Sequence, residues 1–107
     1  MDGPQTPAQK AYGDVSTDFA DLSDRVLFGE VWERPGLSQR DRSLVTVAAL
    51  VANYRHNELP GHVARALANG VSKDELVETV IHLAFYSGWP TANTAIGVLR
   101  TAFADDA

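Results

Sequence analysis

Cysteine is absent from this sequence of 107 residues. A thiol nucleophile, a disulfide and a thiolate metal site are therefore excluded. Without cysteines, the sequence does not indicate whether the protein works in an oxidising or a reducing compartment. Lysine is almost absent too, occurring only as Lys10 and Lys73, and 9 basic residues face 14 acidic ones for a net charge of -5. Because nucleic-acid-binding modules usually carry a basic patch, a nucleic-acid partner is not expected.

Long apolar runs are also missing. No segment approaches the roughly 20 apolar residues that span a bilayer, and residues 1–7 lack the basic and then apolar stretch of a secretory signal. We therefore expect a soluble, cytoplasmic protein with no membrane partner. The 45% of hydrophobic residues suffice for one compact core. A chain this short buries only about two thirds of its unfolded surface, so oligomerisation would be a natural supplement.

The apolar residues recur at helical spacing, and no segment alternates as a strand would. Residues 1–15 are expected to form an arm without a helix, because Pro4, Pro7 and Gly13 interrupt the helical period. Residues 16–107 are expected to form an all-α domain of about five helices, near 16–32, 38–52, 57–70, 72–88 and 89–103. The second and fourth are apolar on almost every side, which predicts buried contacts between the subunits of a homo-oligomer.

Capping residues mark several of these boundaries. Ser38 is expected to begin the second helix, and Asn57 is expected to cap the third. Gly70 is expected to end that third helix in a left-handed conformation. Ser72 and Glu75 form a capping box, which predicts the start of the fourth helix.

Glu58 and His62 form the pair best suited to chemistry. Four residues apart on a helix, their side chains would meet on one face, where the carboxylate would orient the imidazole and favour its protonated form. Histidine both gives and takes a proton near neutrality, because its reference pKa is about 6.5. The same pair on a solvated face would add only a few tenths of a kcal/mol to helix stability, so spacing alone leaves both interpretations open.

Other residues are candidates for contact with a substrate. His82 lies in a nearly all-apolar segment with Tyr86 one turn later, a pattern that fits a core histidine as well as a pocket residue. Arginines can grip carboxylates through two parallel hydrogen bonds, which makes Arg42 and Arg55 candidates for binding an acid. Arg65 is expected to be solvated on an outer face, and a surface ion pair is the alternative for each arginine.

Metal and nucleotide sites are not expected. His56 and His62 are six residues apart, which places them off a shared helical face, and no other ligand spacing occurs. The glycines form no loop of the kind that cradles phosphates.

Residues 26–103 resemble the carboxymuconolactone decarboxylase family, whose fold is shared with the alkylhydroperoxidase D-like proteins. The likeness is carried by several short segments in a fixed order. They are Phe28-Gly29-Glu30-Val31-Trp32, Arg34-Pro35-Gly36-Leu37, the run from Arg40 to Leu50, Asn57-Glu58-Leu59 with His62, Ala68-Asn69-Gly70-Val71, Glu75-Leu76, His82 and Tyr86-Ser87-Gly88-Trp89-Pro90.

The resemblance implies an all-helical subunit, assembly into trimers or hexamers and no cofactor. It also implies an activity, the loss of carbon dioxide from 4-carboxymuconolactone to give an enol-lactone in the β-ketoadipate pathway of aromatic degradation. Under this hypothesis His62 is the proton donor and Glu58 orients it. Arg42, Arg55, His82 and Tyr86 would contact the substrate.

The sister branch of the fold reduces peroxides with a cysteine pair, a histidine and an upstream glutamate. Aligned on His62, its cysteines fall at Arg55 and Glu58, and its glutamate falls near Ser43. A thiol peroxidase is therefore excluded on chemical grounds. Two alternatives to the decarboxylase stay open, namely a related lactone or keto-acid isomerase or proton-transfer enzyme, and a non-catalytic oligomeric protein that binds small molecules.

Overall fold

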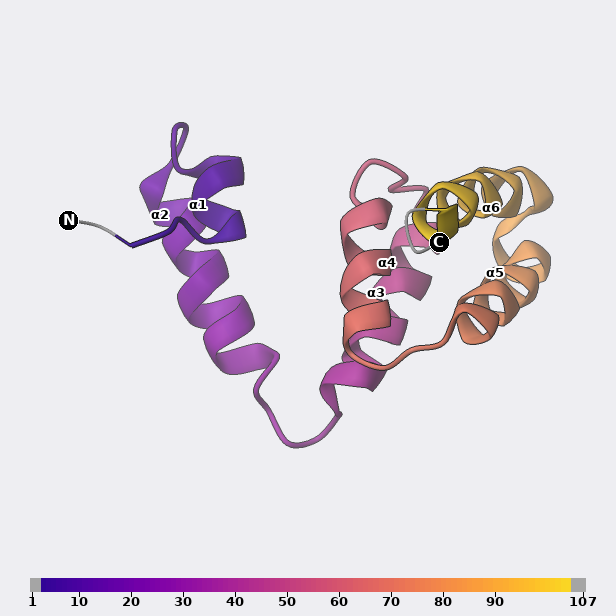
Figure 1. Cartoon of the computed structure of the whole chain (residues 1–107), viewed down its shortest axis with the longest axis horizontal. Coiled ribbons are helices and arrows are strands. Elements are labelled where there is room, and N and C mark those ends of the chain that lie inside the picture. Colours follow the sequence, from indigo (N-terminus) through magenta and orange to yellow (C-terminus); the bar gives the residue numbers. More distant parts are fainter. Residues whose placement is uncertain (1–2, 105–107) are drawn as a thin grey trace. The chain divides into compact units, whose positions relative to one another are not determined.

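A computed structural model describes residues 3–104 of the chain. Residues 1, 2 and 105–107, at the ends of the expected arm and domain, lie outside the described residues. Contacts group the chain into two compact units, Met1–Gly36 and Leu37–Ala107. Each unit is described by itself below, with the helices labelled as in Figure 1. The expected division into an arm and a domain at residues 15 and 16 stays a prediction.

The N-terminal unit contains α1 (Pro7–Tyr12), α2 (Thr17–Leu22) and the π-helical η1 (Ser23–Val31). The backbone N–H of Gln9 donates to Thr6 Oγ1 over 3.1 Å, and the Gln9 side chain accepts from the Thr6 N–H over 2.9 Å. This capping box, with Pro7 at a position where proline is tolerated, begins a helix in a segment expected to have none. The expectation of a helix-free arm is therefore wrong for residues 7–12.

Two contacts within this unit hold α1 against the following helices. Thr6 Oγ1 donates to Asp24 Oδ2 over 2.7 Å, and the rings of Tyr12 and Phe19 meet edge to face with centroids 4.7 Å apart. Helix η1 is followed by Trp32, whose backbone N–H donates to the Leu27 carbonyl over 2.9 Å. This spacing of five residues between donor and acceptor is typical of a π-helix.

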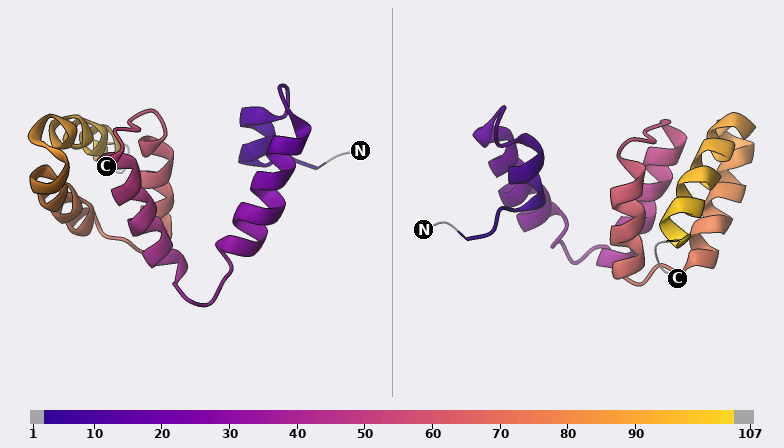
Figure 2. Two further views of the ribbon diagram at one scale, coloured as in Figure 1. Left: turned by 180° about the vertical axis from the view of Figure 1, so that it is seen from behind. Right: turned by 45° about the horizontal axis from the view of Figure 1, so that its top comes forward.

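The second unit contains α3 (Gln39–Ala52), α4 (Leu59–Ala68), α5 (Lys73–Ser87) and α6 (Trp89–Ala104). Helix α3 packs against α4 and α5, and α6 packs against the same two helices. Figures 1 and 2 show α3 beside α4 and α5 beside α6. The core of the unit consists of apolar residues from all four helices and from the loop between α4 and α5, namely Val47, Val51, Leu59, Val63, Ala66, Val71, Leu76, Val80, Ala92, Ala95 and Leu99.

The helix boundaries of this unit follow local chemistry. Ser38 accepts a hydrogen bond from the Asp41 N–H over 3.0 Å, and Ser72 forms the expected capping box with Glu75. Gly70 adopts φ +100°, which confirms the left-handed stop after α4. Asn57 does not cap α4, because that helix begins one residue later, with Glu58 in the capping position and no side-chain cap.

The all-helical fold is confirmed, since the described residues form helices, turns and loops without a strand. Each of the five expected helices is present, and α1 is additional. In residues 3–104 no helix is both long and apolar enough to cross a membrane.

Candidate functional site

Helix α4 carries His62, the leading candidate for a proton donor. Leu59, Val63 and Ala66 turn one side of this helix into the core. His62 is next to the buried Val63 in the sequence, so it lies at the edge of the side of α4 that faces the core. Its side chain is partly buried. Its Nδ1 atom is fully buried and has no hydrogen-bond partner. An imidazole nitrogen in this state has lost water without gaining a protein partner, which is uncommon in a folded protein.

The environment of His62 favours the neutral imidazole. Burial, followed by the positive charge of Arg65, lowers the pKa of His62 below its ordinary value of 6.5. Arg65 lies three residues after His62 on the same helix and is itself partly buried. The expectation that Arg65 is solvated on an outer face is thus met only in part, because its side chain is half-buried.

Glu58 does not pair with His62 in this structure. Its side chain is exposed at the start of α4, and no hydrogen bond or ion pair joins the two residues. The pKa of His62 is lowered rather than raised, so the expectation that Glu58 favours the charged imidazole is corrected here. The backbone of Glu58 is already helical, with φ -89° and ψ -17°, so the missing contact reflects the exposed position of its side chain and not the start of the helix.

Arg42 lies on α3 and is partly buried. The register between α3 and α4 is fixed close to it, where Asn69 Nδ2 donates to Ser43 Oγ over 2.9 Å. Ser43 is only 1% exposed, so this contact is a buried polar link between the two helices. Ser43 thus has a structural role in joining α3 to α4.

Arg55 lies in the turn between α3 and α4, and its side chain is exposed. Its backbone N–H donates to the Leu50 carbonyl over 2.8 Å, and Tyr54 before it adopts φ 57°. The backbone of this turn is therefore well defined. The structure does not bring Arg55 into contact with His62 or Arg42.

His82 and Tyr86 lie together on α5, apart from His62. Their rings stack with centroids 4.7 Å apart and an interplanar angle of 31°. His82 lines a groove of about 440 Å³ between α3 and α5, while Tyr86 is 76% exposed. The same groove is lined by Asp74, Glu75 and Glu78 and by no arginine or lysine. The carboxylate of Glu75 is paired with the Arg40 guanidinium, and the groove holds no basic group that could bind an anion.

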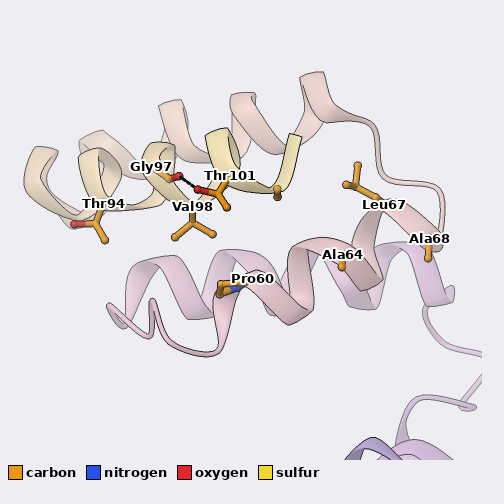
Figure 3. Close-up of a pocket in the computed structure, with 9 residues that line it drawn as sticks. Pro60, Ala64, Leu67, Ala68, Thr94, Gly97, Val98 and Thr101 are labelled. Carbon is orange, nitrogen blue, oxygen red and sulfur yellow. Dashed lines mark hydrogen bonds between the residues drawn. The ribbon is translucent and has the colours of Figure 1, made fainter. Parts of the chain in front are cut away.

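A second groove, of about 850 Å³, lies between α4 and α6 (Figure 3). Small and apolar side chains line it, including Ala64 and Ala68 from α4 and Gly97 and Val98 from α6. Its polar side chains are threonines, and Thr101 makes a hydrogen bond of 3.4 Å to the Gly97 carbonyl of its own helix. No charged group lines this groove, so it offers nothing to hold a carboxylate.

The described cavities are lined neither by His62 nor by Glu58, Arg42 or Arg55. Within residues 3–104, no three histidine, aspartate or glutamate side chains are placed to hold a metal ion.

Comparison with known proteins places these features in a family. Residues 17–101 match the model of the carboxymuconolactone decarboxylase family. A 4-carboxymuconolactone decarboxylase of Acinetobacter baylyi is 44% identical over 92 residues, which cover 86% of this chain and 69% of that protein. Nitrosuccinic acid decarboxylase npaB of Metarhizium robertsii is 37% identical over 100 residues, covering 94% of this chain and 65% of its own length. An uncharacterised 15.0 kDa protein of Paracoccus denitrificans is 29% identical over 94 residues, covering 86% of this chain and 69% of that protein. With most of its length matched by the family model and by the first of these relatives, the chain belongs to the carboxymuconolactone decarboxylase family.

Proposed function

We propose that this protein is a carboxy-lyase that removes carbon dioxide from 4-carboxymuconolactone or a related lactone acid during the degradation of aromatic compounds. The observation that carries the proposal is the 44% identity to a protein of that name over 86% of this chain. The second relative is also named a decarboxylase, although of a different acid. Membership of one family thus supports the reaction type, and the nearer relative supports the substrate.

The reaction requires an electron sink and a proton. When the carboxylate leaves, the electron pair of the breaking carbon–carbon bond passes to the conjugated lactone carbonyl of the substrate itself. The proposal therefore needs no cofactor. The protein contributes by binding the carboxylates, excluding water from the departing one and delivering a proton to carbon.

His62 is the proposed proton donor, and electrostatics favours it over His82. The positive charge of Arg65 acts on His62, whereas Asp74, Glu75 and Glu78 line the groove beside His82. A substrate with more than one carboxylate is attracted to the charge beside His62, whereas the groove beside His82 is lined by no arginine or lysine that would hold it. His82 and Tyr86 are accordingly kept as peripheral contacts in the proposal.

Three further residues complete the proposed site. Arg42 and Arg55 bind substrate carboxylates, for which a guanidinium is well shaped. Glu58 orients His62 in the loaded enzyme, a role that requires its exposed side chain to turn toward the imidazole. The carboxylate would then stabilise the protonated ring.

We also propose a cytoplasmic homo-oligomer, a trimer or hexamer, in which a neighbouring subunit covers the face that carries His62. Large apolar side chains at the junction of α5 and α6 support assembly, since Phe85 is 79% and Trp89 68% exposed. Apolar clusters of this kind usually mark contact surfaces. Light scattering at micromolar concentration tests this, and a monomeric mass would contradict it.

The activity is tested by incubating the purified protein with 4-carboxymuconolactone while carbon dioxide release and lactone absorbance are followed together. The proposal predicts equimolar carbon dioxide and enol-lactone. Loss of lactone absorbance without carbon dioxide would indicate an isomerase. Thermal stabilisation without turnover would indicate a binding protein, since a ligand at a hundred times its dissociation constant stabilises the folded state by about 2.7 kcal/mol.

A further inference from the structure

His62 and Arg65 share one face of α4, because residues three apart on a helix are neighbours. Both side chains are partly buried, and the core residues Leu59, Val63 and Ala66 fix the orientation of the helix beneath them. The imidazole and the guanidinium are therefore presented together by a rigid element. A ligand that contacts both the imidazole and the guanidinium requires the two groups to be held in a fixed arrangement.

On α4 and on the elements that contact it, basic residues outnumber acidic ones. The elements concerned are α4 itself, the turn that precedes it, and α3 and α6, which pack against α4. On α3, the carboxylate of Asp41 is exposed and already bonded to Arg40 over 3.0 Å. Glu58 is exposed and makes no bond to His62. The remaining titratable or charged residues of these elements are Arg40, which also bonds to Glu75 of α5, and Arg42, Tyr54, Arg55, His56 and Arg100.

The buried Nδ1 of His62 adds an independent observation. This nitrogen has no hydrogen-bond partner, although it is removed from solvent. A carboxylate bound to the neighbouring guanidinium would place an acceptor and a negative charge beside the imidazole. The ring would then hold a second proton, with a donor on each nitrogen.

We propose that Arg65 binds one carboxylate of the substrate beside His62, and that His62 takes up its catalytic proton from solvent together with the substrate. This inference rests on the proposed decarboxylation, and it adds a carboxylate-binding residue and a source for the proton. Arg65 contacts the substrate, while its charge keeps the empty site from holding a proton.

The proton can be followed through one cycle. In the empty enzyme His62 is neutral near pH 7, because burial and the charge of Arg65 lower its pKa. The bound carboxylate offsets that charge, so the imidazole gains a proton from water. As carbon dioxide leaves, the bond pair passes to the lactone carbonyl, and the imidazolium proton then forms the new carbon–hydrogen bond. His62 is neutral again, and one proton has been consumed for each carbon dioxide.

The test uses the intact protein and succinate, a dicarboxylate that has no lactone carbonyl as a sink. The pH titration of His62 is followed by NMR with and without succinate, in wild type and in Arg65→Gln, Arg65→Lys and Arg100→Gln. Arg100 is exposed on α6 and serves as the matched control. Circular dichroism confirms that each variant is helical.

We expect succinate to raise the titration midpoint of His62 in wild type and in Arg100→Gln. In Arg65→Gln the midpoint without succinate rises, succinate binds about tenfold more weakly, and succinate shifts the midpoint little. Arg65→Lys keeps the low midpoint of the empty site, because the charge is retained, and binds succinate with intermediate affinity. Succinate binding and a His62 shift in Arg65→Gln equal to those of wild type would overturn the inference.

The same measurements separate this inference from the proposed function. Normal turnover of 4-carboxymuconolactone by Arg65→Gln, with an unchanged His62 titration, would reject the role of Arg65. The proposed decarboxylase activity would not be affected by that result. A succinate-linked His62 shift in a wild-type protein that releases no carbon dioxide rejects the decarboxylase and leaves the coupled anion site standing.

Discussion

Asn69 Nδ2 donates a hydrogen bond of 2.9 Å to Ser43 Oγ and so ties the end of α4 to the first half of α3. Ser43 is 1% exposed, and Asn69 is the residue that ends α4. The bond therefore fixes the register of the helix that carries His62 and Arg65 against the helix that carries Arg42.

Replacing Ser43 by alanine should destabilise the protein by about 1–2 kcal/mol, because the Asn69 amide is left without its buried acceptor. The free energy of unfolding in urea measures this. Thr101→Ala, which removes an exposed hydroxyl, is the control and should change stability by no more than about 0.5 kcal/mol. Additive effects of Ser43→Ala and Asn69→Ala in a double-mutant cycle would show that the bond contributes nothing.

Leu76 lies in the core of the second unit and is fully buried, at 0% exposure. Leu76→Ala should cost about 2–5 kcal/mol, because it removes three buried carbon atoms and leaves a cavity where α5 meets its neighbours. Leu37→Ala is a suitable comparison, since Leu37 is 44% exposed. Chemical denaturation of both variants at one protein concentration measures the difference, and equal losses would contradict the assigned core.

Stability should depend on pH through His62. Its folded-state pKa lies below the ordinary 6.5, so the unfolded chain binds the proton more tightly. The stability that this neutral histidine contributes is complete above pH 6.5 and is lost as the pH falls from there through the lowered folded-state pKa. His62→Gln should flatten the slope of unfolding free energy against pH in this window. An unchanged slope in His62→Gln would mean that the histidine is not buried as described.

Glu58 gives a separate prediction, because its proposed role arises only in the loaded enzyme. Glu58→Gln should lower kcat about tenfold by removing the charge that stabilises the imidazolium. It should leave the His62 titration of the empty protein unchanged, because the two side chains are not in contact there. Stopped assays and NMR on the same sample measure both quantities. A wild-type kcat would remove Glu58 from the mechanism.

The helices were predictable from sequence because their signals are local. Ser38 and Ser72 cap helices with their own side chains, and Gly70 ends one with a positive φ, so a short window of residues determines each boundary. Helix α1 was missed because the capping box of Thr6 and Gln9 outweighs the neighbouring prolines.

The candidate site was predictable only in part. The spacing of Glu58 and His62 predicts contact on a helix, but the Glu58 side chain is exposed and makes no bond to the imidazole. Whether Arg65 is solvated depends on which side of α4 meets the core, and the charge around His82 depends on the carboxylates that share its groove. These are tertiary properties, and residue spacing does not contain them.

The central claim is that His62 delivers the proton that replaces carbon dioxide, and the turnover of His62→Gln tests it most directly. Carbon dioxide release from 4-carboxymuconolactone should fall about 10²- to 10⁴-fold, the usual contribution of a general acid, while mass by light scattering and helical content stay those of wild type. Release at the wild-type rate by a His62→Gln protein of unchanged assembly would contradict the account.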